Sequence, residues 1–155
     1  MPTVRMIIAL TALGLQTGDA CARAVGHSHD PWLAAHVDAL PADVRRSLSA
    51  LQASCGQPRA AHEFSRYLST AGGRHDFIAL HFEHFGCANR AAICTAAGCL
   101  HEVFASTRGG YRRVYSAHVL ELELDLIGGT PVIAISSGRG VAPWVLRWNG
   151  GGFRK

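Results

Sequence analysis

The chain has 155 residues, of which 48% are hydrophobic and 17% charged, and its formal net charge is +4. These values exclude an intrinsically disordered chain and suffice for one domain with a hydrophobic core. The arginines are scattered and Lys155 is the sole lysine, so the basic cluster typical of nucleic-acid-binding proteins is missing.

The first 24 residues have the pattern of a secretory signal peptide. Arg5 precedes an uncharged, mostly apolar run over residues 6–15, which is too short to span a bilayer. Small residues then allow cleavage after Ala22 or after Ala24. We therefore expect a periplasmic or secreted protein in which residues 25–155 form a single domain, with no transmembrane segment after signal removal.

The mature N-terminus is a candidate metal site. Cleavage after Ala24 would make His27 the third residue of the mature protein. A free amine, two deprotonated amides and this imidazole would form a square-planar nitrogen site, the geometry that Cu²⁺ and Ni²⁺ prefer. His29 would add a further ligand. This hypothesis requires the cleavage after Ala24.

One or two helices are predicted before the first strand. The first covers residues 32–40, and a second begins near Pro41. Apolar residues of the second helix recur at steps of four, three and four, which is typical of one buried face, at Val44, Leu48, Leu51 and Cys55. Gly56 and Pro58 then end the helix. We expect Cys55 to be buried against a sheet.

The remainder of the chain has the pattern of β-hairpins. Strands are predicted over residues 63–69, 76–85, 100–105, 111–115, 119–127, 131–136 and 144–148, the last pairing with Phe153. Short glycine-rich turns join several of them, which favours antiparallel pairing. Between Val119 and Ile127, leucines alternate with acidic residues, as in a half-buried strand. The expected fold is α+β, with the helices packed on an antiparallel β-meander.

Signal removal takes Cys21 and leaves four cysteines: Cys55, Cys87, Cys94 and Cys99. An even number in an exported protein predicts two disulfides, for which three pairings exist. Zinc is the competing interpretation, but the spacing lacks the C-x₂-C of common zinc sites.

The residues 74–78, the segment Gly-Cys-Ala at 86–88, and Cys94 and Gly98-Cys99 resemble a group of small exported bacterial disulfide proteins of unknown function. The group has an acidic loop similar to the calcium loops of integrin-type (FG-GAP/VCBS) repeats, and the resemblance covers roughly residues 40–155. It implies fold and compartment but no activity. Residues 69–76 keep Asp76 as their one carboxylate. Calcium needs several oxygen ligands, so we do not expect calcium here.

For the disulfides we predict Cys55–Cys87 and Cys94–Cys99. The first joins the end of a helix to the strand that precedes the cysteine-rich loop, and the second closes a six-residue loop.

The strand over residues 76–85 carries a second candidate metal site. His81 and His84 are three residues apart and so point to opposite faces of a strand. His81 and Glu83 share one face, with His75 at the same parity, and a shallow site from these three is possible. His101 precedes a glutamate but lacks the second histidine of the helical zinc-protease motif.

The leading functional hypothesis is a non-enzymatic exported binding or accessory module, monomeric, whose partner is a periplasmic protein or a cell-envelope ligand. An aromatic surface for that ligand is predicted at Trp144, Trp148, Tyr111 and Tyr115. The alternative is a copper, nickel or zinc protein that uses the mature N-terminus and the histidines. A small hydrolase is the third hypothesis, since Ser136 lies in a loose version of the nucleophile elbow that lacks the following helix. No catalytic residue is assigned.

Overall fold

The computed structural model describes residues 31–70, 72, 76–138 and 140–155. The signal-peptide pattern, His27, His29 and His75 lie outside these residues. The described part of the chain opens with three short helices: α1 (Ala34–Asp38), α2 (Ala42–Leu48) and α3 (Gln52–Cys55), with the 3-10 turn η1 (Ser49–Leu51) before α3. No helix among the described residues is long and apolar enough to cross a membrane.

The helices bury the apolar face expected from the sequence. Val44 and Leu48 of α2 are fully buried, and Cys55 is only 6% exposed. Leu51 packs against the same cluster from the turn η1 and is partly buried. The helical segment ends at Gly56, whose φ of 78° and ψ of −153° form a backbone conformation that is open essentially to glycine alone.

A first, antiparallel sheet follows the helices. Its strand order is β1-β2-β4-β3, and β5 pairs with β4 from Cys99 to Thr107. Its members are β1 (Ser65–Ser69), β2 (Asp76–His81), β3 (Cys94–Thr95), β4 (Gly98–Thr107) and β5 (Gly110–Val119). Between β2 and β3 the chain makes two 3-10 turns, η3 (Phe82–His84) and η4 (Arg90–Ala92). A further turn, η2 (His62–Phe64), precedes β1.

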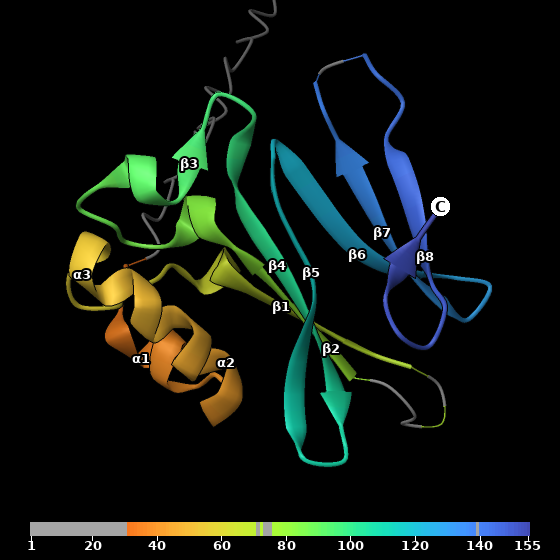
Figure 1. Ribbon diagram of the computed structural model, residues 1–155, viewed down its shortest axis with the longest axis horizontal. Coiled ribbons are helices and arrows are strands. Elements are labelled where there is room, and N and C mark those ends of the chain that lie inside the picture. The colour runs from red at the N-terminus through yellow and green to blue at the C-terminus, as the bar shows by residue number, and fades with distance from the viewer. Residues whose placement is uncertain (1–30, 71, 73–75, 139) are drawn as a thin grey trace, which may run out of the picture.

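The last part of the chain forms a second antiparallel sheet with the order β6-β7-β8-β9. Its strands are β6 (Glu121–Ile127), β7 (Thr130–Ser136), β8 (Trp144–Trp148) and β9 (Phe153–Arg154). Gly128 and Gly129 join β6 to β7 with φ values of 59° and 76°, as a two-residue hairpin turn with two positive φ angles requires. Figure 1 shows the helices on one side of the first sheet and the second sheet on the other.

Two hydrophobic clusters lie on opposite faces of the first sheet. Ile78 and Leu80 of β2 pack in the cluster that contains the helices. Phe77 and Ala79 pack in the cluster that contains the second sheet. Successive residues of a strand point to opposite faces, so the odd-numbered residues of β2 face the second sheet.

The α+β class is confirmed, but the strands form two sheets, whereas we expected one meander. The strand predicted over residues 76–85 ends at His81, where the chain enters η3. Leu120, expected to point inward with the other leucines, is 52% exposed because it lies in the bend between β5 and β6.

Both predicted disulfides are confirmed. Cys55 pairs with Cys87 and Cys94 with Cys99. The first ties the end of α3 to the chain after η3, and the second links β3 to β4. The cysteine-rich stretch is therefore fixed to the helices on one side and to the first sheet on the other.

Candidate metal centre

Two histidines lie side by side at one end of the first sheet. His81 ends β2 and is the antiparallel partner of His101 on β4. Their ring centroids are 5.1 Å apart and the ring planes are nearly perpendicular, at 87°. Cross-strand partners share a face, and His81 has the parity of Phe77 and Ala79, so both imidazoles belong to the face that packs on the second sheet.

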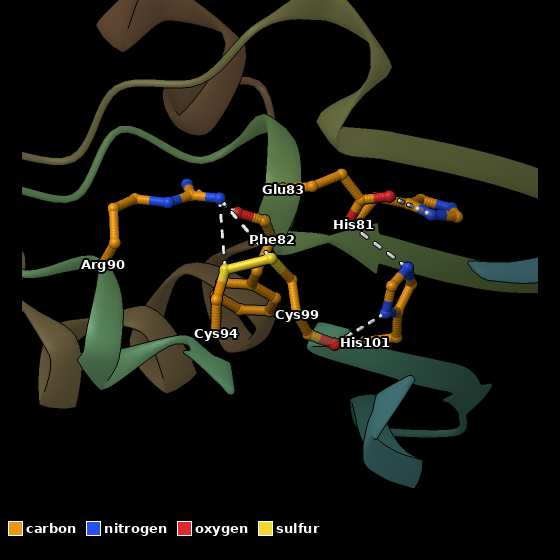
Figure 2. Close-up of polar contacts among 7 residues, drawn as sticks. All are labelled: His81, Phe82, Glu83, Arg90, Cys94, Cys99 and His101. Carbon is orange, nitrogen blue, oxygen red and sulfur yellow. Dashed lines mark hydrogen bonds and ion pairs between the residues drawn. A yellow bond between two sulfur atoms is a disulfide. The ribbon is translucent and has the colours of Figure 1, made fainter. Parts of the chain in front are cut away.

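Glu83 brings a carboxylate to the two imidazoles. It lies in η3, just beyond the end of β2, and Figure 2 shows its side chain between the histidines. Its Oε2 atom is 3.3 Å from His101 Nε2, and its Oε1 atom is 3.8 Å from His81 Nδ1. One ligand atom from each residue lies within 4.8 Å of the other two. Two imidazole nitrogens and one carboxylate oxygen are a donor set of open zinc sites.

Three buried polar atoms in this cluster make no hydrogen bond. They are His81 Nε2, Glu83 Oε2 and His101 Nε2. His101 is fully buried, at 0% exposure. Most buried polar side-chain atoms in proteins have a partner, and an unpaired one costs roughly 1–3 kcal/mol. Two of the three, Glu83 Oε2 and His101 Nε2, face each other at 3.3 Å, and a cation shared by the cluster would give such atoms a partner.

The backbone determines which nitrogen of His101 carries a hydrogen. His101 Nδ1 is 3.0 Å from the carbonyl oxygen of Cys99. A carbonyl only accepts, so Nδ1 is the donor, and in the neutral ring Nε2 presents a lone pair. That lone pair faces the Glu83 carboxylate oxygen at 3.3 Å. Two acceptors repel at this distance unless a proton or a metal ion lies between them.

The protonation states suit metal binding. Burial, and next the neighbouring His101, lower the pKa of His81 to about 4 from its usual 6.5. For Glu83, burial raises the pKa, but interactions with the two histidines and a backbone hydrogen bond lower it more, so its pKa lies below the usual value. At neutral pH His81 is therefore neutral and Glu83 ionised, which are the forms that bind metals.

The cluster opens into a cleft of about 550 Å³. His81 and Glu83 line it, whereas the fully buried His101 is not among its lining residues. The other lining residues come from the two sheets and the turns beside them: Glu63, Arg66, Tyr67, His84, Glu121, Leu122, Glu123 and Leu124. Four carboxylates face one arginine, a balance that favours cations. An ion held by the three ligands would keep a position open toward this cleft.

The structure brings together only part of the predicted metal site. His81 and Glu83 lie close together, but Glu83 belongs to the 3-10 turn η3 and not to the strand on which the prediction placed it, and the position of His75 falls outside the described residues. The third ligand in the described part of the chain is His101, which we did not assign. His101 joins the other two through the register of β2 with β4, for which the sequence pattern gave no signal.

The predicted aromatic surface is not one surface. Tyr111 packs against the cluster with the helices, whereas Tyr115 and Trp148 pack against the cluster with the second sheet. Trp148 also contacts Phe77, with ring centroids 5.1 Å apart. Trp144 is 59% exposed, with the Lys155 ammonium 4.9 Å from its ring centroid. Among the four aromatic residues, Trp144 alone is mainly a surface residue.

Comparison with known proteins finds no match to a family model, a curated protein or a solved structure.

Proposed function

We propose that this chain is an exported metal-binding protein that holds one zinc ion with His81, Glu83 and His101. The observation that carries the proposal is the meeting of His81, Glu83 and His101 at the edge of an acidic cleft, each with a buried polar atom that makes no hydrogen bond. The expected binding module would then be one whose bound partner is a metal ion.

The donor set and the distances favour zinc. Tetrahedral zinc with ligand bonds near 2.0–2.1 Å separates its ligand atoms by about 3.3 Å. The distance from Glu83 Oε2 to His101 Nε2 is 3.3 Å, that from Glu83 Oε1 to His81 Nδ1 is 3.8 Å, and one ligand atom from each of the three residues lies within 4.8 Å of the others, so the side chains would move closer together around the ion. Calcium prefers six to eight oxygen ligands, which this nitrogen-rich set does not provide.

Export is part of the proposal. Two disulfides support an oxidising compartment, because disulfides persist mainly in exported proteins. The signal-peptide pattern of residues 1–24 and the resemblance to exported disulfide proteins agree with it. The copper or nickel site at His27 and His29 is a separate hypothesis.

A zinc titration tests the site. The full chain, freed of metal with a chelator, is titrated with Zn²⁺ against a chromophoric competitor. We expect one tight equivalent in the wild type, loss of that equivalent in His101→Leu, and its retention in His118→Leu, which changes an exposed histidine of β5. The His27→Ala variant separates any binding at the N-terminus. Equal zinc affinity in His101→Leu and the wild type would contradict the proposal.

A stability measurement distinguishes a metal site from a structural cluster. The double variant His81→Leu/His101→Leu replaces the imidazoles with apolar groups and removes the unpaired nitrogens. Removing unpaired buried polar groups offsets the loss of native contacts. The free energy of unfolding of the metal-free double variant should therefore be no lower than that of the wild type, and zinc should no longer raise its Tm. A clear loss of stability, with no zinc effect on the wild type, would show a structural role.

A further inference from the structure

The Cys94–Cys99 disulfide is linked to the proposed metal ligands by a hydrogen bond to the Cys99 backbone. Cys99 and Cys94 are antiparallel partners on β4 and β3. The carbonyl oxygen of Cys99 accepts the hydrogen bond from His101 Nδ1 at 3.0 Å, and this bond orients the imidazole and exposes Nε2 to Glu83. Such outer hydrogen bonds position metal ligands. The position of Cys99 therefore sets the position of one proposed ligand.

Arg90 joins the same disulfide to the turn that carries Glu83. Its Nη2 atom lies 3.1 Å from Cys94 Sγ and 3.4 Å from Cys99 Sγ. Its Nη1 atom donates to the carbonyl oxygens of Phe82 and Phe85, at 3.4 Å and 3.1 Å. Phe82 is the first residue of η3, and Phe85 directly follows this turn. Figure 2 shows the guanidinium between the disulfide and this turn. Two of the three proposed ligands are thus held by groups attached to one disulfide.

We propose that the Cys94–Cys99 disulfide controls the metal affinity of the cluster, so that its reduction releases the ion. The inference rests on the proposed zinc site. When the disulfide is intact, Cys99 and Arg90 hold His101 and Glu83 in the ligating geometry. When it is open, β3 loses its covalent link to β4, and two free thiols replace the sulfurs that Arg90 contacts. Outer-shell changes of this kind lower metal affinity on the order of 10-fold to 100-fold.

The reductant is a dithiol, such as the active-site pair of a disulfide reductase. One of its thiolates attacks a sulfur of Cys94–Cys99, the S–S bond breaks, and a mixed disulfide forms. The second thiolate of the reductant then displaces the remaining cysteine sulfur. The dithiol is oxidised to a disulfide, Cys94 and Cys99 gain two electrons and two protons as thiols, and zinc keeps its oxidation state. The Arg90 guanidinium stabilises the departing thiolate, which favours attack here.

The other disulfide has a different environment. Cys55 is buried in the core and its partner Cys87 is partly exposed, whereas both sulfurs of Cys94–Cys99 belong to partly exposed residues. The strand β3 has two residues and pairs only with β4. A dithiol therefore reaches Cys94–Cys99 more readily, and opening it disturbs little beyond the cluster.

The test compares the zinc affinities of two variants of the full chain. Cys94→Ala/Cys99→Ala opens the proposed control disulfide, and Cys55→Ala/Cys87→Ala opens the other. We expect zinc affinity to fall on the order of 10-fold to 100-fold in the first and to stay close to the wild type in the second. Far-UV circular dichroism and intact mass verify the fold and the remaining disulfide. Unchanged affinity in Cys94→Ala/Cys99→Ala would overturn the inference.

Two further measurements keep the test decisive if a cysteine variant does not fold. Arg90→Met in the oxidised protein removes the guanidinium that links the disulfide to η3 but leaves both disulfides intact. It should weaken zinc binding, whereas the control Arg112→Met on β5 should not. Reduction and reoxidation of the wild type should lower and then restore its zinc affinity.

Two outcomes separate the inference from the proposed function. A thiolate-to-metal charge-transfer band with Co²⁺ after reduction would make the cysteines ligands and overturn the inference. No zinc binding by the oxidised wild type would instead contradict the proposed function itself.

Discussion

Removing the two disulfides separately should cost different amounts of stability, with the larger loss at Cys55–Cys87. The paired cysteines are 32 residues apart in Cys55–Cys87 and 5 apart in Cys94–Cys99. In the chain-entropy model the stabilisation grows with the logarithm of the loop length, which gives about 3.7 kcal/mol for the longer loop and about 2.1 kcal/mol for the shorter. The difference is about 1.6 kcal/mol. Burial of Cys55 in the core acts in the same direction, because its truncation also removes packing.

Urea unfolding measures this difference. Cys55→Ala/Cys87→Ala and Cys94→Ala/Cys99→Ala are unfolded in the presence of a chelator, so that metal binding does not contribute, and tryptophan fluorescence follows the transition. The free energy of unfolding should be lower in the first variant. Equal values or the reverse order would refute the loop-entropy reasoning. The expected order also supports the redox test, because the variant that should lose zinc affinity is the more stable of the two.

Two other predictions concern the same region. Gly98→Ala should lower the free energy of unfolding by about 1–3 kcal/mol, because Gly98 has a φ of 122° and an added Cβ would lie 2.1 Å from the Val119 carbonyl oxygen. Gly109→Ala, where the Cβ would meet no atom within 4 Å, is the control in thermal unfolding, and equal losses would contradict the steric argument. In the metal-free protein, the free energy of unfolding should rise from pH 4 to pH 6.5. In this range His81 of the unfolded chain, with its usual pKa of 6.5, binds a proton, whereas His81 of the folded protein, with a pKa of about 4, stays neutral. The gain is at most about 3 kcal/mol. Urea unfolding across this pH range measures it, and a wild-type slope no steeper than that of His81→Leu would contradict the assignment.

The sequence predicts the part of the site that depends on local geometry. His81 and Glu83 are two residues apart, and strand periodicity assigned them to one face. The strand ends at His81, however, and it is the 3-10 turn η3 that places Glu83 beside the histidine. His101 joins them through the pairing of β2 with β4, which are separated in the chain by η3, η4 and β3. The register of strands distant in sequence is not encoded in the periodicity of either strand. The proximity of His81 and Glu83 follows from their nearness in the sequence, whereas the approach of His101 depends on a strand register that the sequence pattern does not give.

A β-bulge explains why the aromatic surface was wrongly expected to be continuous. Tyr111 and Tyr115 have the same parity, which predicts one face for both. The register of β4 with β5 shifts between Val103 and Phe104, so the two tyrosines lie on opposite faces. Bulges reorient side chains in this way. The division of the strands into two sheets was also not predicted. The alternation in β6 predicts that one face is buried, but it does not indicate which surface covers that face.

The face of the first sheet that meets the second sheet changes from apolar to polar along β2 and β4. Its cross-strand pairs are Phe77–Ala105, Ala79–Val103 and His81–His101. The first two are apolar, as a core requires, and a third apolar pair would avoid unpaired buried atoms that cost roughly 1–3 kcal/mol each. A ligand at 100 times its Kd stabilises the folded protein by about 2.7 kcal/mol, which is of the same size. If zinc binds as proposed, it therefore supplies the stability that a third apolar pair would have given. The fold then depends at this edge on metal supply and, through Cys99, on the thiol redox state of its surroundings.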